Sequence, residues 1–335
     1  MPAKPAALAA ALVAAFSAAA FDTAATAAET RTVHALAMHG EPKYGPDFKH
    51  FDYANPDAPK GGEIRFAADP RRKTTAAATG VRMIKAVSFD LWDTIVHDDS
   101  DEPKRAALGL RSKKAERRHL VWQALNRYGA IDPAAVTLAY DVADAAFNAV
   151  WHDRHITWTI GERLRVLLKG LGRALPDPEF AEIVRRHEEM EIEVRPDLVP
   201  GIAEALKALH GRYRTCVVSD AIVSPARCLR RLIDGHGLTP YFDGFAFSDE
   251  VGYSKPHRAM FESAARQMGV GLTEIVHIGD RDHNDVKGPQ ALGMKAVLFV
   301  GTRAADRDRT TADAVCERHA DLPAIVDRLA ADSSR

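Results

Sequence analysis

Residues 86–94, Ala-Val-Ser-Phe-Asp-Leu-Trp-Asp-Thr, read as a short buried strand that ends in two carboxylates and a hydroxyl group. Val87 and Phe89 are β-branched or aromatic, as is typical of a strand that is covered on both faces. Asp90 follows at the carboxyl end of this strand, where open α/β sheets bind their ligands. A single aspartate often just ends a strand, so this stretch needs support from other parts of the chain.

Three later stretches give that support, because each places polar residues after a strand-like run or in a loop. They are TCVVSD at 215–220, GYSKP at 252–256, and IVHIGD at 275–280 followed by Asp285. Further apolar runs at 245–247 and 296–300 alternate with helical patterns. This alternation of strands and helices predicts a parallel, doubly wound α/β sheet.

These four motifs, in this order, resemble those of the haloacid dehalogenase (HAD) superfamily of hydrolases over residues 83–328. The resemblance implies a HAD-like Rossmannoid fold, with an all-helical cap inserted between the first and second motifs. It also implies an enzyme, most simply a phosphatase that hydrolyses a small phosphomonoester through an aspartyl-phosphate on Asp90.

The residue types suit this chemistry. A carboxylate nucleophile divides one difficult step into two easier ones, and Mg²⁺ prefers carboxylate, carbonyl and phosphate oxygens. The catalytic residues that we predict are Asp90, Asp93 and Lys255, and the predicted substrate-binding residues are Thr94, Ser219, Asp220 and Lys255. The predicted Mg²⁺ ligands are Asp90, the backbone carbonyl of Trp92, Asp280 and Asp285. Singly, these aspartates are also typical of helix caps, and Lys255 of a surface lysine; the ordered set favours a catalytic site.

The chain departs from the family's phosphatases at Trp92, where they usually carry an aspartate that acts as general acid and base. Asp93 or a cap residue would have to supply that proton. This departure leaves two alternatives open. One is a metal-free 2-haloacid dehalogenase, which also has an aromatic residue there but lacks Gly-Asp in the fourth motif. The other is a catalytically weak HAD protein that acts by binding.

The interval between Asp90 and Ser219 is far longer than one βα crossover needs, and its apolar spacing predicts four helices. One passes through 121–128, and the others begin at Asp132, at Thr159 and at Asp177. The basic run at 111–118 favours a solvated helix face over a patch that binds substrate phosphate or nucleic acid. Trp151, His152, His155 and Trp158 favour packing, with substrate recognition as the alternative.

The first 82 residues have another character. An apolar, alanine-rich run followed by small residues is typical of a secretory signal peptide, and 34–66 resembles the mature start of a family 5 extracellular solute-binding protein. We predict a signal peptide at 1–28, a solute-binding-protein-like fragment with a linker at 29–82, a HAD core at 83–98 and 197–330, and a helical cap at 99–196. The leader should be largely irregular. We interpret the chain as a fusion, either natural or an artefact, and a secreted solute-binding fragment is a further alternative function.

Composition sets limits on the partners. A formal net charge of −1 gives no global field for nucleic acid or an anionic membrane, and the three cysteines are too few for a disulfide framework. We expect a small phosphorylated metabolite as partner, no nucleic acid, no stable membrane span, and a monomer or homodimer. The expected location is the periplasm or the exterior if the signal is genuine, and the cytoplasm if translation starts at Met83.

Overall fold

The computed structural model describes residues 83–333 of the chain. The predicted signal peptide and the solute-binding-protein-like fragment lie outside these described residues. Within them, no helix is long and apolar enough to cross a membrane.

In the described part of the chain, six parallel strands form one sheet in the order β3-β2-β1-β4-β5-β6. They are β1 (Ala86–Phe89), β2 (Arg214–Ser219), β3 (Gly244–Phe247), β4 (Ile275–Gly279), β5 (Lys295–Phe299) and β6 (Ala314–Cys316). The predicted doubly wound parallel sheet is therefore confirmed. The strand order reverses at β1, which pairs with β2 on one side and β4 on the other, and such a switch point leaves a crevice at the carboxyl ends of the strands.

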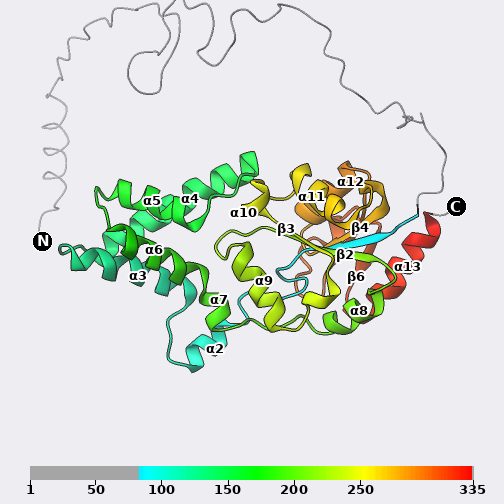
Figure 1. Ribbon diagram of the computed structural model, residues 1–335, viewed down its shortest axis with the longest axis horizontal. Helices are drawn as coiled ribbons and strands as arrows, with labels where there is room; N and C mark the ends of the chain where they lie inside the picture. Colours follow the sequence, from blue (N-terminus) through cyan, green and yellow to red (C-terminus); the bar gives the residue numbers. More distant parts are fainter. Residues whose placement is uncertain (1–82, 334–335) are drawn as a thin grey trace, which may run out of the picture. The chain divides into compact units, whose positions relative to one another are not determined.

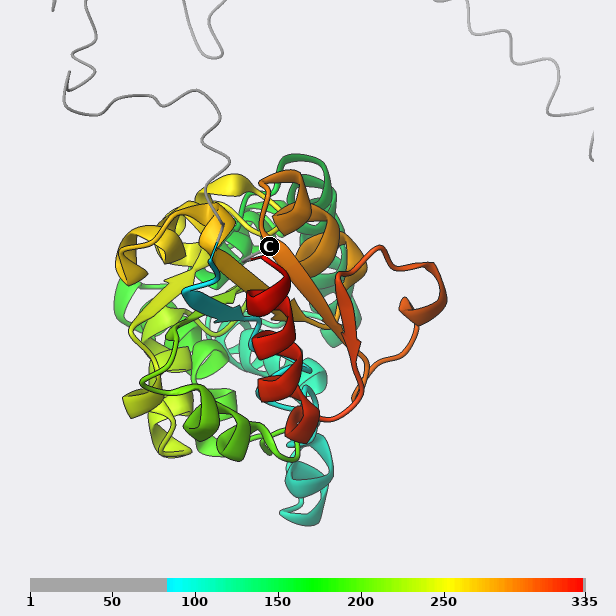
Figure 2. The same ribbon diagram turned by 90° about the vertical axis from the view of Figure 1, so that its right-hand side faces the viewer.

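Helices cover both faces of the sheet, because successive side chains of each strand point to opposite sides. Val87 and Phe89 pack into an apolar cluster with side chains of α8 (Ile202–Leu209), α9 (Ala226–Gly235) and α13 (Leu322–Asp332). Ala86 belongs to the cluster on the other face, formed with α11 (Arg258–Met268). Figure 2 shows α13 crossing the sheet in the foreground.

Short helices complete the core. They are η1 (Thr239–Tyr241), α10 (Ser248–Val251), η2 (Leu272–Glu274), η3 (Asp282–Lys287), α12 (Gly288–Ala291), η4 (Arg307–Arg309) and η5 (His319–Asp321).

The segment between β1 and α8 is helical, as predicted, but has more helices than the four expected. It contains α2 (Glu102–Ala107), α3 (Lys113–Arg127), α4 (Pro133–Arg154), α5 (Ile160–Gly170), α6 (Asp177–Glu188) and α7 (Met190–Glu193). The two extra helices, α2 and α7, are too short for an apolar period to reveal them. We keep 99–196 as the proposed limits of this cap. Figure 1 shows α3–α6 gathered at one end and the sheet at the other.

The expected helix starts are present in the cap. Asp132 accepts a hydrogen bond from Ala134 N, and Thr159 and Glu162 form a capping box at the start of α5. The cap has its own apolar core, which includes Val121, Leu164 and Ile183.

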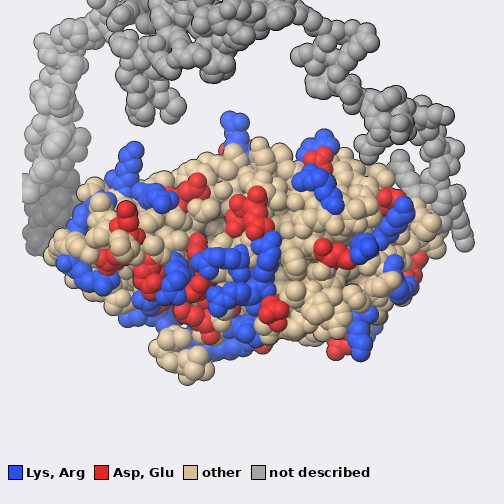
Figure 3. All heavy atoms as spheres, in the orientation of Figure 1, with Lys and Arg blue, Asp and Glu red and all other residues tan. Residues whose placement is uncertain are grey.

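A short loop after α4 ties the cap to the sheet domain. Thr157 Oγ1 bonds Ser248 Oγ at 2.8 Å and Ser254 Oγ at 2.5 Å, and the Ser254 N–H donates to the His155 carbonyl at 2.7 Å. These bonds fix the end of α4 beside the loop that carries Lys255. Figure 3 shows Lys and Arg side chains next to Asp and Glu on the face in view. Exposed ion pairs of this kind include Arg230–Glu250, at 2.6 Å.

Candidate active site

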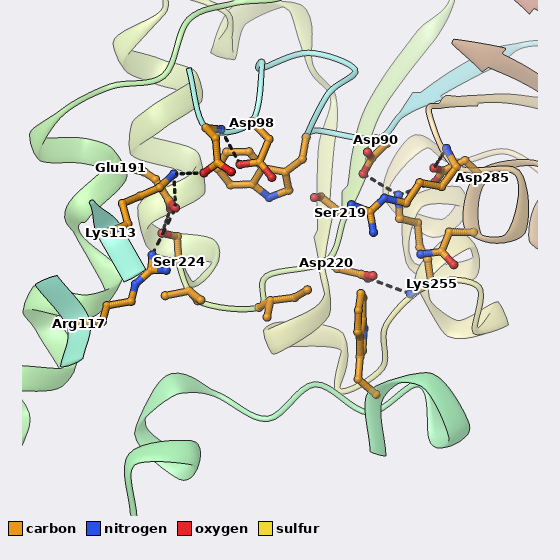
Figure 4. Close-up of a pocket in the computed structure, with 17 residues that line it drawn as sticks. Asp90, Asp98, Lys113, Arg117, Glu191, Ser219, Asp220, Ser224, Lys255 and Asp285 are labelled. Atoms are coloured by element: carbon orange, nitrogen blue, oxygen red, sulfur yellow. Dashed lines mark hydrogen bonds and ion pairs between the residues drawn. The ribbon is translucent and has the colours of Figure 1, made fainter. Parts of the chain in front are cut away.

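The carboxyl ends of three neighbouring strands bring the predicted site residues together. Asp90 follows β1, Ser219 ends β2 and Asp280 follows β4, and the pairing of β1 with both other strands makes these ends adjacent. Lys255 comes from the loop after α10. Figure 4 shows Asp90, Ser219, Lys255 and Asp285 around one end of a cavity.

Lys255 is the centre of a buried ion-pair network. Its Nζ lies 2.6 Å from Asp90 Oδ1 and 2.6 Å from Asp285 Oδ1, and the lysine is 4% exposed. Its backbone N–H donates to Asp220 Oδ1 at 2.9 Å. Burial acts to lower the pKa of Lys255, but Asp285 and Asp90 outweigh it and raise that pKa. The ammonium group is therefore held charged beside Asp90.

Three buried carboxylates form a cluster that suits a divalent cation. One oxygen each of Asp90, Asp280 and Asp285 can be chosen so that all three lie within 4.8 Å of one another. Among the described residues, none donates a hydrogen bond to the buried Oδ2 of Asp280. Burial, together with Asp90 and Asp285, raises the pKa of Asp280 to about 8, and burial raises that of Asp90 to about 6. A cation bound by these oxygens would offset this unfavourable charge, so the residues fit Mg²⁺.

Asp285 differs from the other two carboxylates because both of its oxygens are already engaged. Oδ1 accepts from Lys255, and Oδ2 accepts the Arg281 N–H at 3.0 Å. Its side chain packs directly on Gly279, where a Cβ atom would come within 2.3 Å of Asp285 Cγ. Glycine is therefore required at the end of β4 for this arrangement. Burial opposes ionisation, but Lys255 and a hydrogen bond from His277 hold the pKa of Asp285 well below its usual range.

His277 and Ser88 extend this network into the sheet, and sequence reasoning did not single them out. Ser88 Oγ and His277 Nδ1 are 2.8 Å apart, and His277 Nε2 lies 3.2 Å from Asp285 Oδ1. Both residues are fully buried, and burial lowers the pKa of His277, which favours the neutral ring. A neutral ring that accepts from Ser88 presents its N–H to Asp285. Polar residues inside two otherwise apolar strands were the signal that could have found them.

The turn after β1 places the next predicted residues differently. Trp92 lines the cavity. Asp93, in contrast, lies in a left-handed turn with φ 55°, where its Oδ1 accepts the Asp98 N–H at 3.1 Å, and it does not line the cavity. Thr94 is buried and its carbonyl accepts from His319 Nε2 at 2.7 Å, so it supports the turn from behind.

The cavity has a volume of about 240 Å³ and lies between core and cap. At the core end, the Oγ of Ser219 has no hydrogen-bond partner among the described residues, and burial raises the pKa of Asp220 to about 7. At the cap end, Lys113 pairs with Asp101 at 2.8 Å. Asp98 also lines the cavity, where burial and Asp99 raise its pKa to about 6.

The basic run of α3 is only partly a solvated face. Lys113 is 4% exposed, and Arg117, whose Nε and Nη2 lack hydrogen-bond partners in the described chain, lines the cavity with it. The predicted solvated face is therefore wrong for these two residues. Glu191 Oε1 lies 3.5 Å from Lys113 Nζ and 3.6 Å from Arg117 Nη2. A helical wheel of α3 cannot show these ion pairs, because Glu191 belongs to α7.

Comparisons with known proteins bear on the family and the fold of this chain. The model of a hydrolase family described as haloacid dehalogenase-like hydrolase matches residues 84–293. A glyceraldehyde 3-phosphate phosphatase of Methanopyrus kandleri is 28% identical over 247 residues, covering 72% of this chain and 94% of that protein.

Two solved structures share the fold. A 2-haloacid dehalogenase from Pseudomonas syringae is 24% identical with a TM-score of 0.54, and covers 74% of this chain and 100% of its own. A HAD phosphatase from Thermococcus onnurineus is 22% identical with a TM-score of 0.50, and covers 72% of this chain and 98% of its own.

Proposed function

Because this chain belongs to the haloacid dehalogenase-like hydrolase family, we propose that it is a Mg²⁺-dependent phosphatase that hydrolyses a small phosphomonoester through Asp90. The observation that carries the proposal is the convergence of Asp90, Asp280 and Asp285 within 4.8 Å beside the buried ammonium of Lys255. The phosphatase name of the Methanopyrus relative supports the same reaction class.

In the proposed reaction, a carboxylate oxygen of Asp90 attacks the phosphorus atom and the alcohol oxygen of the substrate leaves with the bonding pair. Water then attacks the resulting aspartyl-phosphate, which releases inorganic phosphate and restores Asp90. Lys255 orients the nucleophile through its bond at 2.6 Å and stabilises negative charge that develops on the phosphoryl oxygens. The free hydroxyl of Ser219 can donate to one of these oxygens.

Asp90, Asp280 and the backbone carbonyl of Trp92 would hold the metal ion, with Asp285 beside them. When bound, Mg²⁺ would offset the repulsion between the carboxylate and the anionic phosphate. The orphaned oxygen of Asp280 and its raised pKa support this assignment.

Proton delivery to the leaving oxygen needs an acid, because Trp92 has no proton to transfer to an alkoxide. Asp93 does not line the cavity, whereas Asp220 and Asp98 do. We assign this role to Asp220, since its raised pKa of about 7 keeps a proton available at neutral pH and it lies next to Ser219 and Lys255. General acid help of this kind is typically worth about 10²–10⁴-fold.

The test is turnover of p-nitrophenyl phosphate by the purified chain with Mg²⁺, with EDTA, and in the Asp90→Asn variant. We expect activity only in the first case. Activity that persists with EDTA but disappears in Asp90→Asn would keep the phosphatase and refute its dependence on Mg²⁺. No turnover of the phosphate ester, together with release of chloride from 2-chloropropionate, would establish the dehalogenase alternative. Equal activity of Asp90→Asn and the unmodified chain would refute the role of Asp90.

A further inference from the structure

A second cavity, of about 430 Å³, adjoins the catalytic one. Trp151, Lys255, Arg281 and Asn284 line both. The second cavity lies between the end of α4, which supplies Trp151 and His155, and the η3 segment after β4, which supplies His283. A molecule whose phosphate lies at Asp90 can therefore extend its leaving group past Arg281 into this space.

This space is rich in hydrogen-bond donors that the protein leaves unused. The buried indole Nε1 of Trp151 has no partner in the part of the chain that the structure describes. Among the described residues, the only ion pair of the Arg281 side chain is with Asp280, whose Oδ2 lies 3.8 Å from Arg281 Nε. The rings of His155 and His283 face the same cavity with centroids 6.4 Å apart. A buried donor without a partner, such as Trp151 Nε1, is an exception in a folded protein and is characteristic of a site that binds an acceptor.

Acidic residues do not cancel this donor set. Asp282 pairs with Lys287 at 2.8 Å, and Asp306 pairs with Arg303 at 2.7 Å and with Arg309. Each carboxylate in the lining is therefore already neutralised by a neighbouring cation.

The site is also held in place. His155 ends α4 in a left-handed conformation with φ 53°, and its carbonyl accepts the Ser254 N–H at 2.7 Å, one residue before Lys255. This hydrogen bond fixes the cap side of the cavity to the loop that carries Lys255. A subsite that is already rigid before binding loses less conformational entropy when a ligand binds.

We propose that this second cavity binds an anionic group of the leaving alcohol, so that the preferred substrates are phosphomonoesters with a carboxylate or a second phosphate. Arg281 is the principal contact, because a guanidinium binds either anion with two parallel hydrogen bonds, and Trp151, His155 and His283 supply further donors. The proposal rests on the proposed function, since it places the scissile phosphate at Asp90.

The test compares matched ligands by calorimetry on the full chain carrying Asp90→Asn, which separates binding from turnover. Glycerol 3-phosphate and 3-phosphoglycerate share a three-carbon skeleton and differ by a carboxylate. Fructose 6-phosphate and fructose 1,6-bisphosphate differ by a second phosphate, so the two pairs distinguish the anions. We expect at least one anionic member to bind about 10-fold or more tightly than its partner, as charge-assisted hydrogen bonds imply.

Arg281→Gln should reduce this preference to about 2-fold or less. Arg258→Gln is the matched control: it removes the same charge from an ion pair with Glu262 on α11, outside both cavities, and should keep the preference. Equal affinities within both ligand pairs would overturn the subsite. An equal loss of the preference in Arg281→Gln and Arg258→Gln would also overturn it, because such a loss would indicate a long-range charge effect. Failure of p-nitrophenyl phosphate turnover in the unmodified chain would instead refute the phosphatase, so the two failures are distinguishable.

Discussion

Replacing Asp280 by asparagine should stabilise the metal-free protein and at the same time abolish its stabilisation by Mg²⁺. The side chain is 1% exposed, and its carboxylate lies in a cluster with Asp90 and Asp285. Without a cation, the cluster places like charges close together in a buried site. Asparagine keeps the shape of the side chain and removes one of those charges, so it relieves repulsion and removes a metal ligand in one step.

The magnitude follows from the pKa of Asp280, which burial and its two neighbours raise from 3.8 to about 8. The folded state then binds the proton more tightly than the unfolded state, so stability falls as pH rises between these two values. One pKa unit corresponds to about 1.4 kcal/mol, which gives about 4 kcal/mol at pH 7 if Asp280 alone bears the effect. The coupled carboxylates share this destabilisation. We therefore expect Asp280→Asn to raise the free energy of unfolding of the metal-free protein by about 2 kcal/mol, or its Tm by roughly 4–8 °C.

Thermal unfolding in EDTA and in excess Mg²⁺, at pH 5 and pH 8, measures both effects. The unmodified chain should lose stability in EDTA between pH 5 and pH 8 and regain it with Mg²⁺, by about 2.7 kcal/mol at one hundred times Kd. Asp280→Asn should show a weaker pH dependence and no response to Mg²⁺. Asp282→Asn is the control: this carboxylate pairs with Lys287, which contributes to lowering its pKa, so its loss should leave the Mg²⁺ response intact.

A metal-free Asp280→Asn protein that is less stable than the unmodified chain at pH 7 would refute the repulsion argument. A full Mg²⁺ response in that variant would refute the assignment of Asp280 as a ligand.

Substitutions at three further residues test the rest of the site. Lys255→Met leaves Asp90 and Asp285 without their cation, so the free energy of unfolding measured in EDTA should fall by about 3–5 kcal/mol. Its kcat should fall by about 10²–10³-fold. An unchanged kcat would exclude Lys255 from the reaction. His277→Leu removes the hydrogen-bond donor to Asp285, which is worth about 1.5–3 kcal/mol, and should lower kcat about 10-fold. His277→Gln restores an N–H at the position of Nε2 and should recover most of the lost kcat. Equal rates of the two variants would show that only the packing of His277 matters. Asp220→Asn should slow hydrolysis of an alkyl phosphate about 10²-fold but barely change that of p-nitrophenyl phosphate, whose leaving group departs without a proton; equal slowing of both substrates would assign the acid elsewhere.

Much of this molecule follows from local patterns in the chain. The apolar runs that end at Asp90, Ser219 and Gly279 predict strands, because burial on both faces of a sheet requires nearly continuous hydrophobic side chains. The helix starts at Asp132 and Thr159 are equally local, since a capping side chain bonds backbone groups only two or three residues away.

Other features depend on contacts between residues far apart in the chain. The solvated face predicted for α3 is wrong at Lys113, because the acids that neutralise it are Asp101, which precedes α2, and Glu191 of α7. No local pattern assigns a role to His277. Its role depends on its contacts with Ser88 of β1 and Asp285 of η3. The donors of the second cavity likewise come from α4 and η3, which no local pattern relates.

Short stretches of the chain were enough to predict a nucleophile, a cation and metal ligands, because residue type and the ends of strands are local properties. Which of these residues line one cavity depends on the folded chain: Asp220 lines it, whereas Asp93 lies in the turn after β1. The physical reason is that side-chain direction and burial are set by long-range packing. Packing also sets the pKa values, because charges act through space rather than along the chain.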